Sequence, residues 1–318
     1  MMHDLFYSMK DKPFLLMESS PSFTNWQPVS KQKKPGIAEL AALQTVAHGA
    51  DSVLYFQWRA SRGAEEKLHG AVIGHDGRED ARSFTETAQV GLRLEALAEI
   101  TAVKREKQAA IVHDWQNKWA LEGSCGPRNA GMGYWDELKR HYNALAREGI
   151  AVEFVDQNAD LTGYGLVVVP MLYLLTDAFA KKLCAFAQNG GTVIVTYWSG
   201  VVDESDLCRL GDTPYGLTEL LGCAAPKLTA CMTGKPAAAC RQLAAHCLRH
   251  RHPPCVRWRP LTRKIRQSRS ACMARTILPG IRLRRSTDTV RAALTISPAA
   301  LTKLFIGRFI TMLQRKSA

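Results

Sequence analysis

The pattern of hydrophobic and polar residues over the first hundred positions predicts two strand–loop–helix units. Apolar runs over 14–17 and 53–58 are short and bounded by turn-forming residues, which is typical of buried strands. Each run is followed by a polar loop and then by a segment with helical periodicity, over 36–50 and 82–103. This βαβα order predicts parallel strands that are covered by helices.

A second alternating pattern lies between residues 106 and 223. Near-continuous runs of Val, Ile and Leu predict strands that are buried on both faces, and these runs are separated by helical segments. The predicted strands are 109–114, 151–155, 166–170 and 192–196, and the predicted helices are 134–148 and 177–189. We therefore expect a compact, parallel three-layer α/β domain.

The charge distribution changes abruptly after Cys223. The chain has 42 Lys and Arg, 29 Asp and Glu, and a formal charge of +13. Residues 224–318 hold 20 of the basic residues and one acidic residue, Asp288, so this stretch carries +19 and the rest carries −6. Because it also lacks apolar periodicity, except over 301–313, we expect a disordered basic tail with one isolated helix.

Two interpretations of residues 224–318 remain open. One is a basic arm that binds nucleic acid non-specifically and in a salt-dependent way. The other is a shifted reading frame, because the alternative frame that starts at the third base of the Pro226 codon permits an acidic segment. We favour the shifted frame, since Cys, His, Pro and Trp are mixed with the basic residues without the pattern of a binding face.

Several classes of protein are not indicated. None of the nine Cys forms a C-x-x-C pair, no zinc-ligand spacing is present, and there is no glycine-rich nucleotide motif. No run approaches the roughly 20 apolar residues of a membrane span, and residues 1–10 lack the features of a signal peptide. We expect a cytoplasmic protein without a metal or organic cofactor.

Candidate chemistry lies where the first two predicted strands end. Glu18 ends the first apolar run, and the carboxyl ends of parallel strands are where catalytic groups lie in α/β barrels. Glu66 and His69 lie in the charged loop that follows the second strand. By themselves, these two residues are more typical of a solvated loop than of a binding site.

The surrounding motifs resemble the β-galactosidases of glycoside hydrolase family 42. Residues 14–26 and the motif Y-F-Q-W-R-x-S-R-G-x-x-E-K-x-H-G over 55–70 look like the last two βα units of that family's (β/α)8 barrel. Residues 113–121 and 197–210 are similar to its second domain, which mediates trimer formation. That domain resembles the class I amidotransferase fold but lacks its catalytic Cys.

The resemblance implies roles for four residues. Glu18 corresponds to the nucleophile of a retaining mechanism, Trp26 to a residue that lines the galactose subsite, and Glu66 and His69 to ligands of galactose hydroxyls. A retaining glycosidase needs a second carboxyl group roughly 5–5.5 Å from the nucleophile. In the family this acid/base lies on an early barrel strand, far upstream, so we expect that it and six strands are missing here.

The sequence therefore predicts a fragment of a retaining β-galactosidase that is inactive alone. Residues 1–105 would be the end of the catalytic barrel, 106–223 an α/β trimerisation domain, and 224–318 a tail translated out of frame. The intact relative would bind a β-galactoside and form a homotrimer. The competing hypotheses are a non-catalytic self-association module and a nucleic-acid-binding basic tail.

Overall fold

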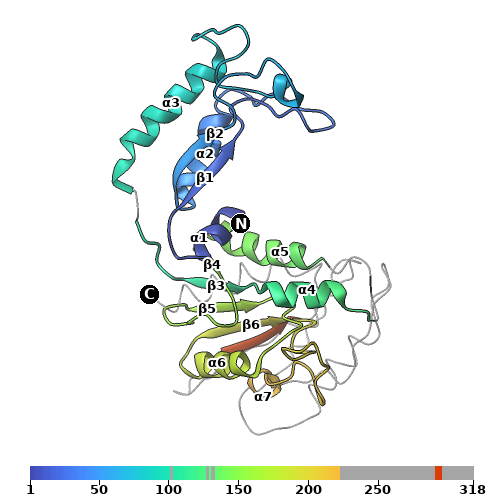
Figure 1. Ribbon diagram of the computed structural model, residues 1–318. Helices are drawn as coiled ribbons and strands as arrows, with labels where there is room; N and C mark the ends of the chain where they lie inside the picture. Colours follow the sequence, from blue (N-terminus) through green and yellow to red (C-terminus); the bar gives the residue numbers. More distant parts are fainter. Residues whose placement is uncertain (101–102, 127–128, 130–132, 223–290, 296–318) are drawn as a thin grey trace, which may run out of the picture. The chain divides into compact units, whose positions relative to one another are not determined.

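The structure, a computed structural model, comprises two compact units, Met1–Arg105 and Glu106–Ala318 (Figure 1). The described residues are 1–100, 103–126, 129, 133–222 and 291–295, the last of these by backbone alone. We describe each unit by itself, and element labels follow Figure 1.

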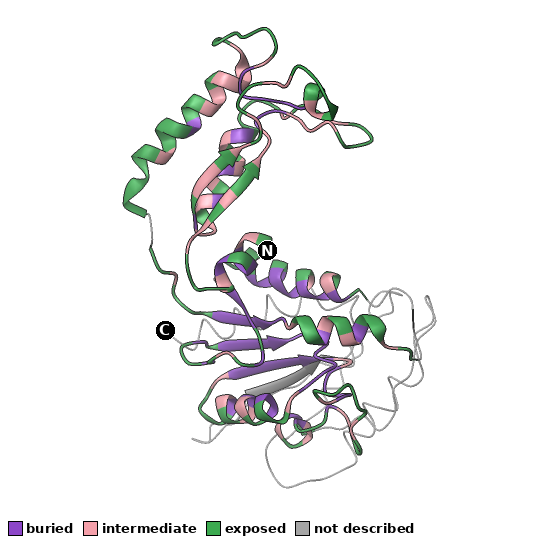
Figure 2. Ribbon diagram, viewed as in Figure 1, coloured by how far each residue is buried: buried purple, intermediate pink, exposed green. Residues whose placement is uncertain are grey.

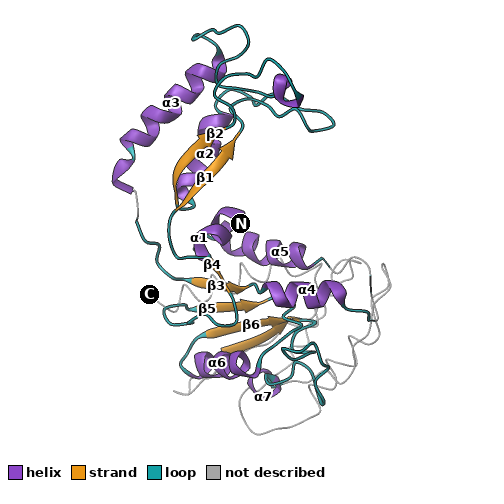
Figure 3. Ribbon diagram, viewed as in Figure 1, coloured by secondary structure: helices purple, strands orange, loops and turns teal. Residues whose placement is uncertain are grey.

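Unit 1 contains a two-stranded parallel sheet with helices. Its elements are α1 (Met2–Ser8), β1 (Phe14–Ser19), α2 (Ile37–Ala47), β2 (Ala50–Tyr55), the 3-10 helix η1 (Glu65–Leu68), α3 (Arg82–Ala96) and the 3-10 helix η2 (Ala98–Ile100). Helix α2 connects the two strands and packs against β2 and α3 (Figure 3). This is the predicted βαβα order, although the helix expected over 82–103 ends at Ala96 and continues only as η2.

A buried carboxylate fixes the first helix of unit 1. Asp4 is buried, and its Oδ1 lies 2.8 Å from Nδ1 of His48 and 2.5 Å from Nη1 of Arg105. The Arg105 guanidinium also lies 4.0 Å from the centre of the Tyr7 ring. These contacts join the start of unit 1 to the end of α2 and to the last residue of the unit.

The two strands of unit 1 differ from their predicted bounds. Strand β1 extends through Ser19, so that Glu18 lies inside the strand and one residue before its end. Strand β2 ends at Tyr55, whereas the apolar run predicted a strand as far as Trp58. After Tyr55 the apolar run no longer pairs with β1, because its backbone pairs with another segment. Val72 N donates to Gln57 O at 2.9 Å, and Ile73 N donates to Trp58 O at 2.8 Å.

Unit 2 is built on a parallel sheet with helices on both sides. Its elements are β3 (Ala109–Val112), α4 (Trp115–Gly123), α5 (Tyr134–Arg147), β4 (Val152–Val155), β5 (Leu166–Val169), α6 (Asp177–Gln188), β6 (Thr192–Thr196), α7 (Thr218–Leu221) and β7 (Arg291–Thr295). The strand order is β4-β3-β5-β6-β7, and every neighbouring pair is parallel. Helices α5 and α6 lie on opposite faces of the sheet (Figure 1). This is the predicted three-layer α/β architecture.

The core of unit 2 follows from the apolar runs. Every residue of strands β3 to β6 is buried, as the runs of Val, Ile and Leu predict for a sheet covered on both faces (Figure 2). On α6, Phe179 and Leu183 lie four residues apart, and both are fully buried against this sheet. The α/β core is thus determined by local sequence and completed by helix packing.

Strand β7 departs from the expected course of the basic tail. Arg291–Thr295 pairs in parallel with β6, residue for residue from Thr192↔Arg291 to Thr196↔Thr295. The lack of apolar periodicity in residues 224–318 predicts no strand there, so β7 is a correction to that expectation. A parallel partner is possible here because β6 would otherwise be an edge strand with unpaired N–H and C=O groups. The predicted helix over 301–313 and the predicted disorder elsewhere lie outside the described residues.

Candidate functional site

The candidate residues of unit 1 gather at the carboxyl end of the β1–β2 pair. Ser19 pairs with Tyr55, and Phe56 N donates to Ser19 O at 3.1 Å. The two loops that follow these strands therefore begin side by side. Glu18, one residue before Ser19, has an exposed side chain at this end of the sheet.

The two loops are joined to one another beyond the strand ends. Asn25 Nδ2 donates to Glu65 O at 2.7 Å, and Gly70 N donates to Phe23 O at 3.0 Å. A Cβ at position 70 would lie 2.3 Å from Ser22 Oγ and 2.5 Å from Phe23 O. Glycine is therefore required for this approach, which brings the loop with Trp26 to the loop with Glu66 and His69.

Glu66 and His69 are held by contacts within the second loop. Gln57 Nε2 donates to Glu66 O at 3.2 Å, while the His69 ring stacks edge-on against Phe56 at 5.1 Å between centroids. His69 is buried, and its Nδ1 lies 2.8 Å from Gly70 O. Because a carbonyl oxygen can only accept, Nδ1 carries the proton, and Nε2 of the neutral ring is left as an acceptor.

Two further observations describe what this end of the sheet offers a ligand. The Trp26 side chain is exposed, which leaves its ring free to cover an apolar surface. Glu66 Oε2 is buried, and within the described part of the chain it accepts no hydrogen bond. A buried carboxylate oxygen without a donor is costly, so a hydroxyl donor from a ligand would be stabilising there.

Two positioning residues were not singled out from the sequence. Gln57 belongs to the quoted motif, and it links Glu66 to Ser61, whose Oγ donates to Gln57 Oε1 at 2.8 Å. Asn25 precedes Trp26 and ties its loop to Glu65. The motif over 55–70 could have indicated Gln57, which belongs to it. No sequence pattern indicated that Asn25 contacts Glu65, which is forty residues away.

Comparisons with known proteins agree with both units. Residues 1–97 match the family described as "Beta-galactosidase", and residues 107–245 match the "Beta-galactosidase trimerisation domain". The β-galactosidase BglY of Alicyclobacillus acidocaldarius is 51% identical over 235 residues, which is 74% of this chain and 34% of the relative.

Solved structures give the same result for the fold. A β-galactosidase from Rahnella sp. R3 superposes with a TM-score of 0.71 at 49% identity, covering 74% of this chain and 35% of that one. A β-galactosidase from Bacillus circulans superposes with a TM-score of 0.70 at 40% identity, covering 73% and 35%. The matched three quarters of the chain thus have the same relatives in sequence and in structure.

The chain belongs to glycoside hydrolase family 42. It spans about one third of the length of the relatives that it matches, since the shares are 34% and 33% for the β-galactosidases of A. acidocaldarius and Bacillus licheniformis. Within the family, residues 1–97 of unit 1 match a part of the β-galactosidase domain, and residues 107–245 of unit 2 match the trimerisation domain. The latter match continues to residue 245, past Cys223, where the change in composition had predicted that the resemblance ends.

In unit 2, structural contacts hold the segments that follow the carboxyl ends of strands β3, β5 and β6. Asn117 clamps the segment after β5, since its Nδ2 donates to Met171 O at 3.2 Å and its Oδ1 accepts from Leu174 N at 3.0 Å. Trp198 follows β6 with a positive φ of 63°, and the next residue, Ser199, accepts from Leu172 N at 3.1 Å. The turn after β6 therefore carries an indole side chain at its positive-φ position.

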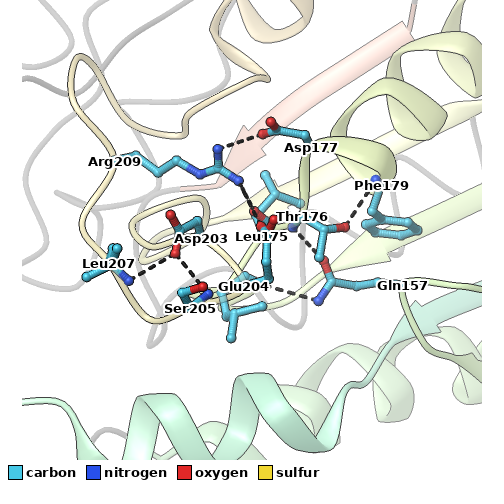
Figure 4. Close-up of polar contacts among 11 residues, drawn as sticks. Gln157, Leu175, Thr176, Asp177, Phe179, Asp203, Glu204, Ser205, Leu207 and Arg209 are labelled. Atoms are coloured by element: carbon cyan, nitrogen blue, oxygen red, sulfur yellow. Dashed lines mark hydrogen bonds and ion pairs between the residues drawn. The ribbon is translucent and has the colours of Figure 1, made fainter.

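Arg209, whose side chain is 12% exposed, holds the loop after β6 to the start of α6 (Figure 4). Arg209 Nη2 donates to Leu175 O at 2.9 Å, and Nη1 lies 2.6 Å from Asp177 Oδ1. Asp203 closes the loop by accepting from Ser205 N at 2.9 Å and from Leu207 N at 3.0 Å. Figure 4 also draws the contacts of Thr176, whose N donates to Gln157 Oε1 at 2.9 Å and whose Oγ1 accepts from Phe179 N at 3.2 Å.

His113 and Asp114 also have structural partners. Asp114 caps α4, accepting from Gln116 N at 2.8 Å and from Asn117 N at 3.3 Å. His113 Nδ1 lies 3.1 Å from the Tyr134 hydroxyl. In the part of the chain that the structure describes, no group of three or more His, Cys, Asp or Glu residues could hold a metal ion. No helix among those same residues is long and apolar enough to cross a membrane.

Proposed function

We propose that unit 1 supplies the nucleophile and the galactose-binding side chains of a retaining β-galactosidase site. The observation that carries the proposal is the convergence of Glu18 with the loops of Trp26, Glu66 and His69 at one end of the β1–β2 pair. The printed names of the relatives, which are β-galactosidases, supply the substrate class.

Each side chain has a role that suits its chemistry. The Glu18 carboxylate is exposed and can approach an anomeric carbon. The exposed Trp26 ring suits the apolar face of a galactose ring. Glu66 Oε2, which lacks a donor among the described residues, can accept from a sugar hydroxyl, and His69 Nε2 can accept from another.

The reaction needs two carboxyl groups. In the first step the Glu18 carboxylate forms a bond to the anomeric carbon, and the glycosidic bond breaks as an acid protonates the leaving oxygen. In the second step the same acid, now a base, takes a proton from water, whose oxygen displaces Glu18. The resemblance assigns this acid/base to no residue among the 318, so we propose that the 318-residue polypeptide is inactive alone.

Fragment complementation tests this proposal. The 318-residue chain would be mixed or co-expressed with the remaining two thirds of the A. acidocaldarius β-galactosidase, and hydrolysis of nitrophenyl β-galactoside would be measured. We expect no turnover from either piece and restored turnover from both, which Glu18→Gln abolishes. Turnover by the chain alone that survives Glu18→Gln, or a restored mixture that is insensitive to this change, would contradict the assignment.

Self-association through unit 2 is a second candidate function. It is supported by the match of residues 107–245 to the β-galactosidase trimerisation domain. We propose that unit 2 joins copies of this chain into a homotrimer whether or not the barrel is complete. Sedimentation equilibrium of the full chain tests this, and a molecular mass equal to one chain at all concentrations would rule it out.

A further inference from the structure

The loop that carries Trp26 begins and ends at one place in unit 1. The chain leaves the end of β1 through Ser20 and Ser22, and it returns beside them at Lys33, whose backbone N donates to Ser22 O at 2.9 Å. Residues 23–32 therefore form a surface loop whose two ends are joined. We call the junction of Ser20, Ser22 and Lys33 the neck of this loop.

Lys33 contributes both its backbone and its side chain to the neck. Its ammonium Nζ donates to Ser20 O, one residue beyond β1, so two hydrogen bonds from one residue cross the neck. The Lys33 carbonyl accepts from Nη2 of Arg82, the first residue of α3, at 2.9 Å. Arg82 Nη1 lies 3.3 Å from Glu86 Oε1 in the next turn of that helix. Lys33 thus fastens the neck to the end of β1 and to α3.

Burial distinguishes Lys33 from the lysines beside it. The run K-Q-K-K over 31–34 contains three lysines, of which Lys31 and Lys34 are exposed. Lys33 is half-buried, and this burial lowers the pKa of its ammonium group. An ammonium that is partly withdrawn from water is stabilised by a carbonyl acceptor, and a charged donor makes a stronger hydrogen bond than a neutral one. The bond from Lys33 to Ser20 is therefore a substantial contact of the neck.

The rest of the loop is anchored only on the side that precedes Trp26. Phe23 O accepts from Gly70 N, and Asn25 Nδ2 donates to Glu65 O, so both contacts reach the second site loop. Residues 27–32 form no hydrogen bond with any other residue that the structure describes. Trp26 is 68% exposed, so packing alone does not fix its ring. On the side that follows Trp26, the chain is therefore first held at Lys33.

We propose that Lys33 is a positioning residue, which closes the neck so that the Trp26 ring keeps a fixed place relative to Glu18. Glu18 lies two residues before Ser20, so the ammonium bond joins the returning end of the loop to the segment that carries this carboxylate. The inference rests on the galactose site proposed above and adds a residue that does not itself touch the sugar. A ring and a carboxylate that are already in place lose little entropy when a sugar binds.

The test observes the Trp26 ring in the full-length chain by fluorine NMR after incorporation of 5-fluorotryptophan. Trp26→Phe assigns its resonance, and Trp58→Phe assigns that of a second exposed indole of unit 1, which lies outside the loop. Lys33→Met removes the ammonium but keeps an unbranched side chain, and Lys33→Arg keeps a charged donor. The matched control is Lys31→Met, which removes an exposed lysine of the same loop.

We expect Lys33→Met to shift or broaden the Trp26 resonance and to leave the Trp58 resonance unchanged, while Lys33→Arg restores the resonance of the parent. Galactose is then titrated and followed at the Trp26 resonance. The dissociation constant is expected to rise roughly 10-fold in Lys33→Met, which is the effect of losing one hydrogen bond from a charged group. It is expected to stay unchanged in Lys31→Met.

Several outcomes would overturn the role of Lys33. One is a Trp26 resonance that is the same in the parent and in Lys33→Met, and another is an equal effect of Lys31→Met. Joint collapse of the Trp26 and Trp58 resonances would show that Lys33 holds unit 1 as a whole, which also overturns a specific role. If the Trp26 resonance responds to Lys33→Met but the parent does not respond to galactose, the neck stands and galactose binding by this chain is refuted.

Discussion

Gly70 is where the two site loops of unit 1 come closest. A Cβ there would lie 2.3 Å from Ser22 Oγ and 2.5 Å from Phe23 O, and the backbone oxygen cannot rotate away as a side chain can. The residue therefore sets the distance between the loop of Trp26 and the loop of His69. The sequence motif contained this glycine but not the reason for it.

We predict that Gly70→Ala separates these loops. The expected loss is about 2 kcal/mol of unfolding free energy, because the new methyl group must displace backbone. Urea unfolding of the full-length chain measures it. Gly63→Ala is the control, since no atom lies within 4 Å of a Cβ at that position. Equal effects of the two substitutions would contradict the explanation.

His113 makes the stability of unit 2 depend on pH. Burial lowers its pKa below the usual 6.5, against a smaller opposing effect of Asp114. In the unfolded chain the imidazole takes up its proton as the pH falls below about 6.5, whereas in the folded chain it does so only at lower pH. The free energy of unfolding is therefore independent of this group above about pH 6.5, and it decreases as the pH falls below that value.

We predict that His113→Asn makes the unfolding free energy less sensitive to pH between about 7.5 and 5.5. The variant is expected to be less stable at about pH 7.5, because it loses the ring contacts with Trp115 and Trp135. Urea unfolding at the two pH values gives the comparison. A parent and a variant with the same pH slope would show that the imidazole is not responsible.

At the scale of elements, the Arg209 side chain connects the loop after β6 to the start of helix α6. Arg209 is 12% exposed, donates to Leu175 O, and lies 4.5 Å from the centre of the Tyr215 ring. Its carboxylate partners, Asp177 and Glu204, are mostly exposed, so water screens these two ion pairs. The carbonyl bond and the ring contact are therefore the main contributions.

We predict that Arg209→Met lowers the unfolding free energy of unit 2 by about 2 kcal/mol, chiefly because Leu175 O loses its hydrogen-bond donor. Thermal unfolding of the full chain measures the change. Arg78→Met serves as the control, since that arginine pairs with Asp80 on the surface, with both side chains more than half exposed. The control is expected to unfold like the parent, and a similar loss in both variants would refute the argument.

Strand β7 protects the edge of β6. The backbones of the two strands pair in parallel, in a register that runs from Thr192↔Arg291 to Thr196↔Thr295. Proline at the centre of β7 removes an N–H and cannot remain in a sheet ladder. The pairing is therefore open to a direct backbone test that does not depend on any side chain of the tail.

We predict that Ala293→Pro releases β7 and accelerates amide hydrogen exchange in β6, from Thr192 to Thr196. Hydrogen exchange followed by mass spectrometry reports on this peptide. Ser317→Pro, at a position outside β7, is the control and should leave exchange unchanged. Unaltered exchange in Ala293→Pro would mean that β7 does not cover the edge in solution.

For the whole molecule, the two units differ in how well each buries its own apolar residues. In unit 2, β3 to β6 are buried completely. In unit 1, Leu15 and Met17 on β1 and Trp58 beyond β2 remain exposed. Two βα units offer too little surface to cover both faces of their strands, which is why we expect unit 1 to need a complementary barrel segment for activity.

Much of the fold could be predicted because it is encoded locally. The four buried strands of unit 2 were recognised from continuous Val, Ile and Leu runs, and helices α5 and α6 from their periodicity. The end of β2 was predicted wrongly, because the run continues to Trp58 in mostly apolar residues. Its backbone pairs with Val72 and Ile73, a contact that no local pattern contains.

The sequence by itself determined the family, the order of strands and helices, and the four residue types at the candidate site, because motif and periodicity are properties of neighbouring positions. Only the tertiary structure decided that Asn25 and Gly70 tie the two site loops together, and that the rings of Trp115, Trp119 and Trp135 form one cluster. These contacts join residues that are distant along the chain, so they exist only once packing has brought their elements together.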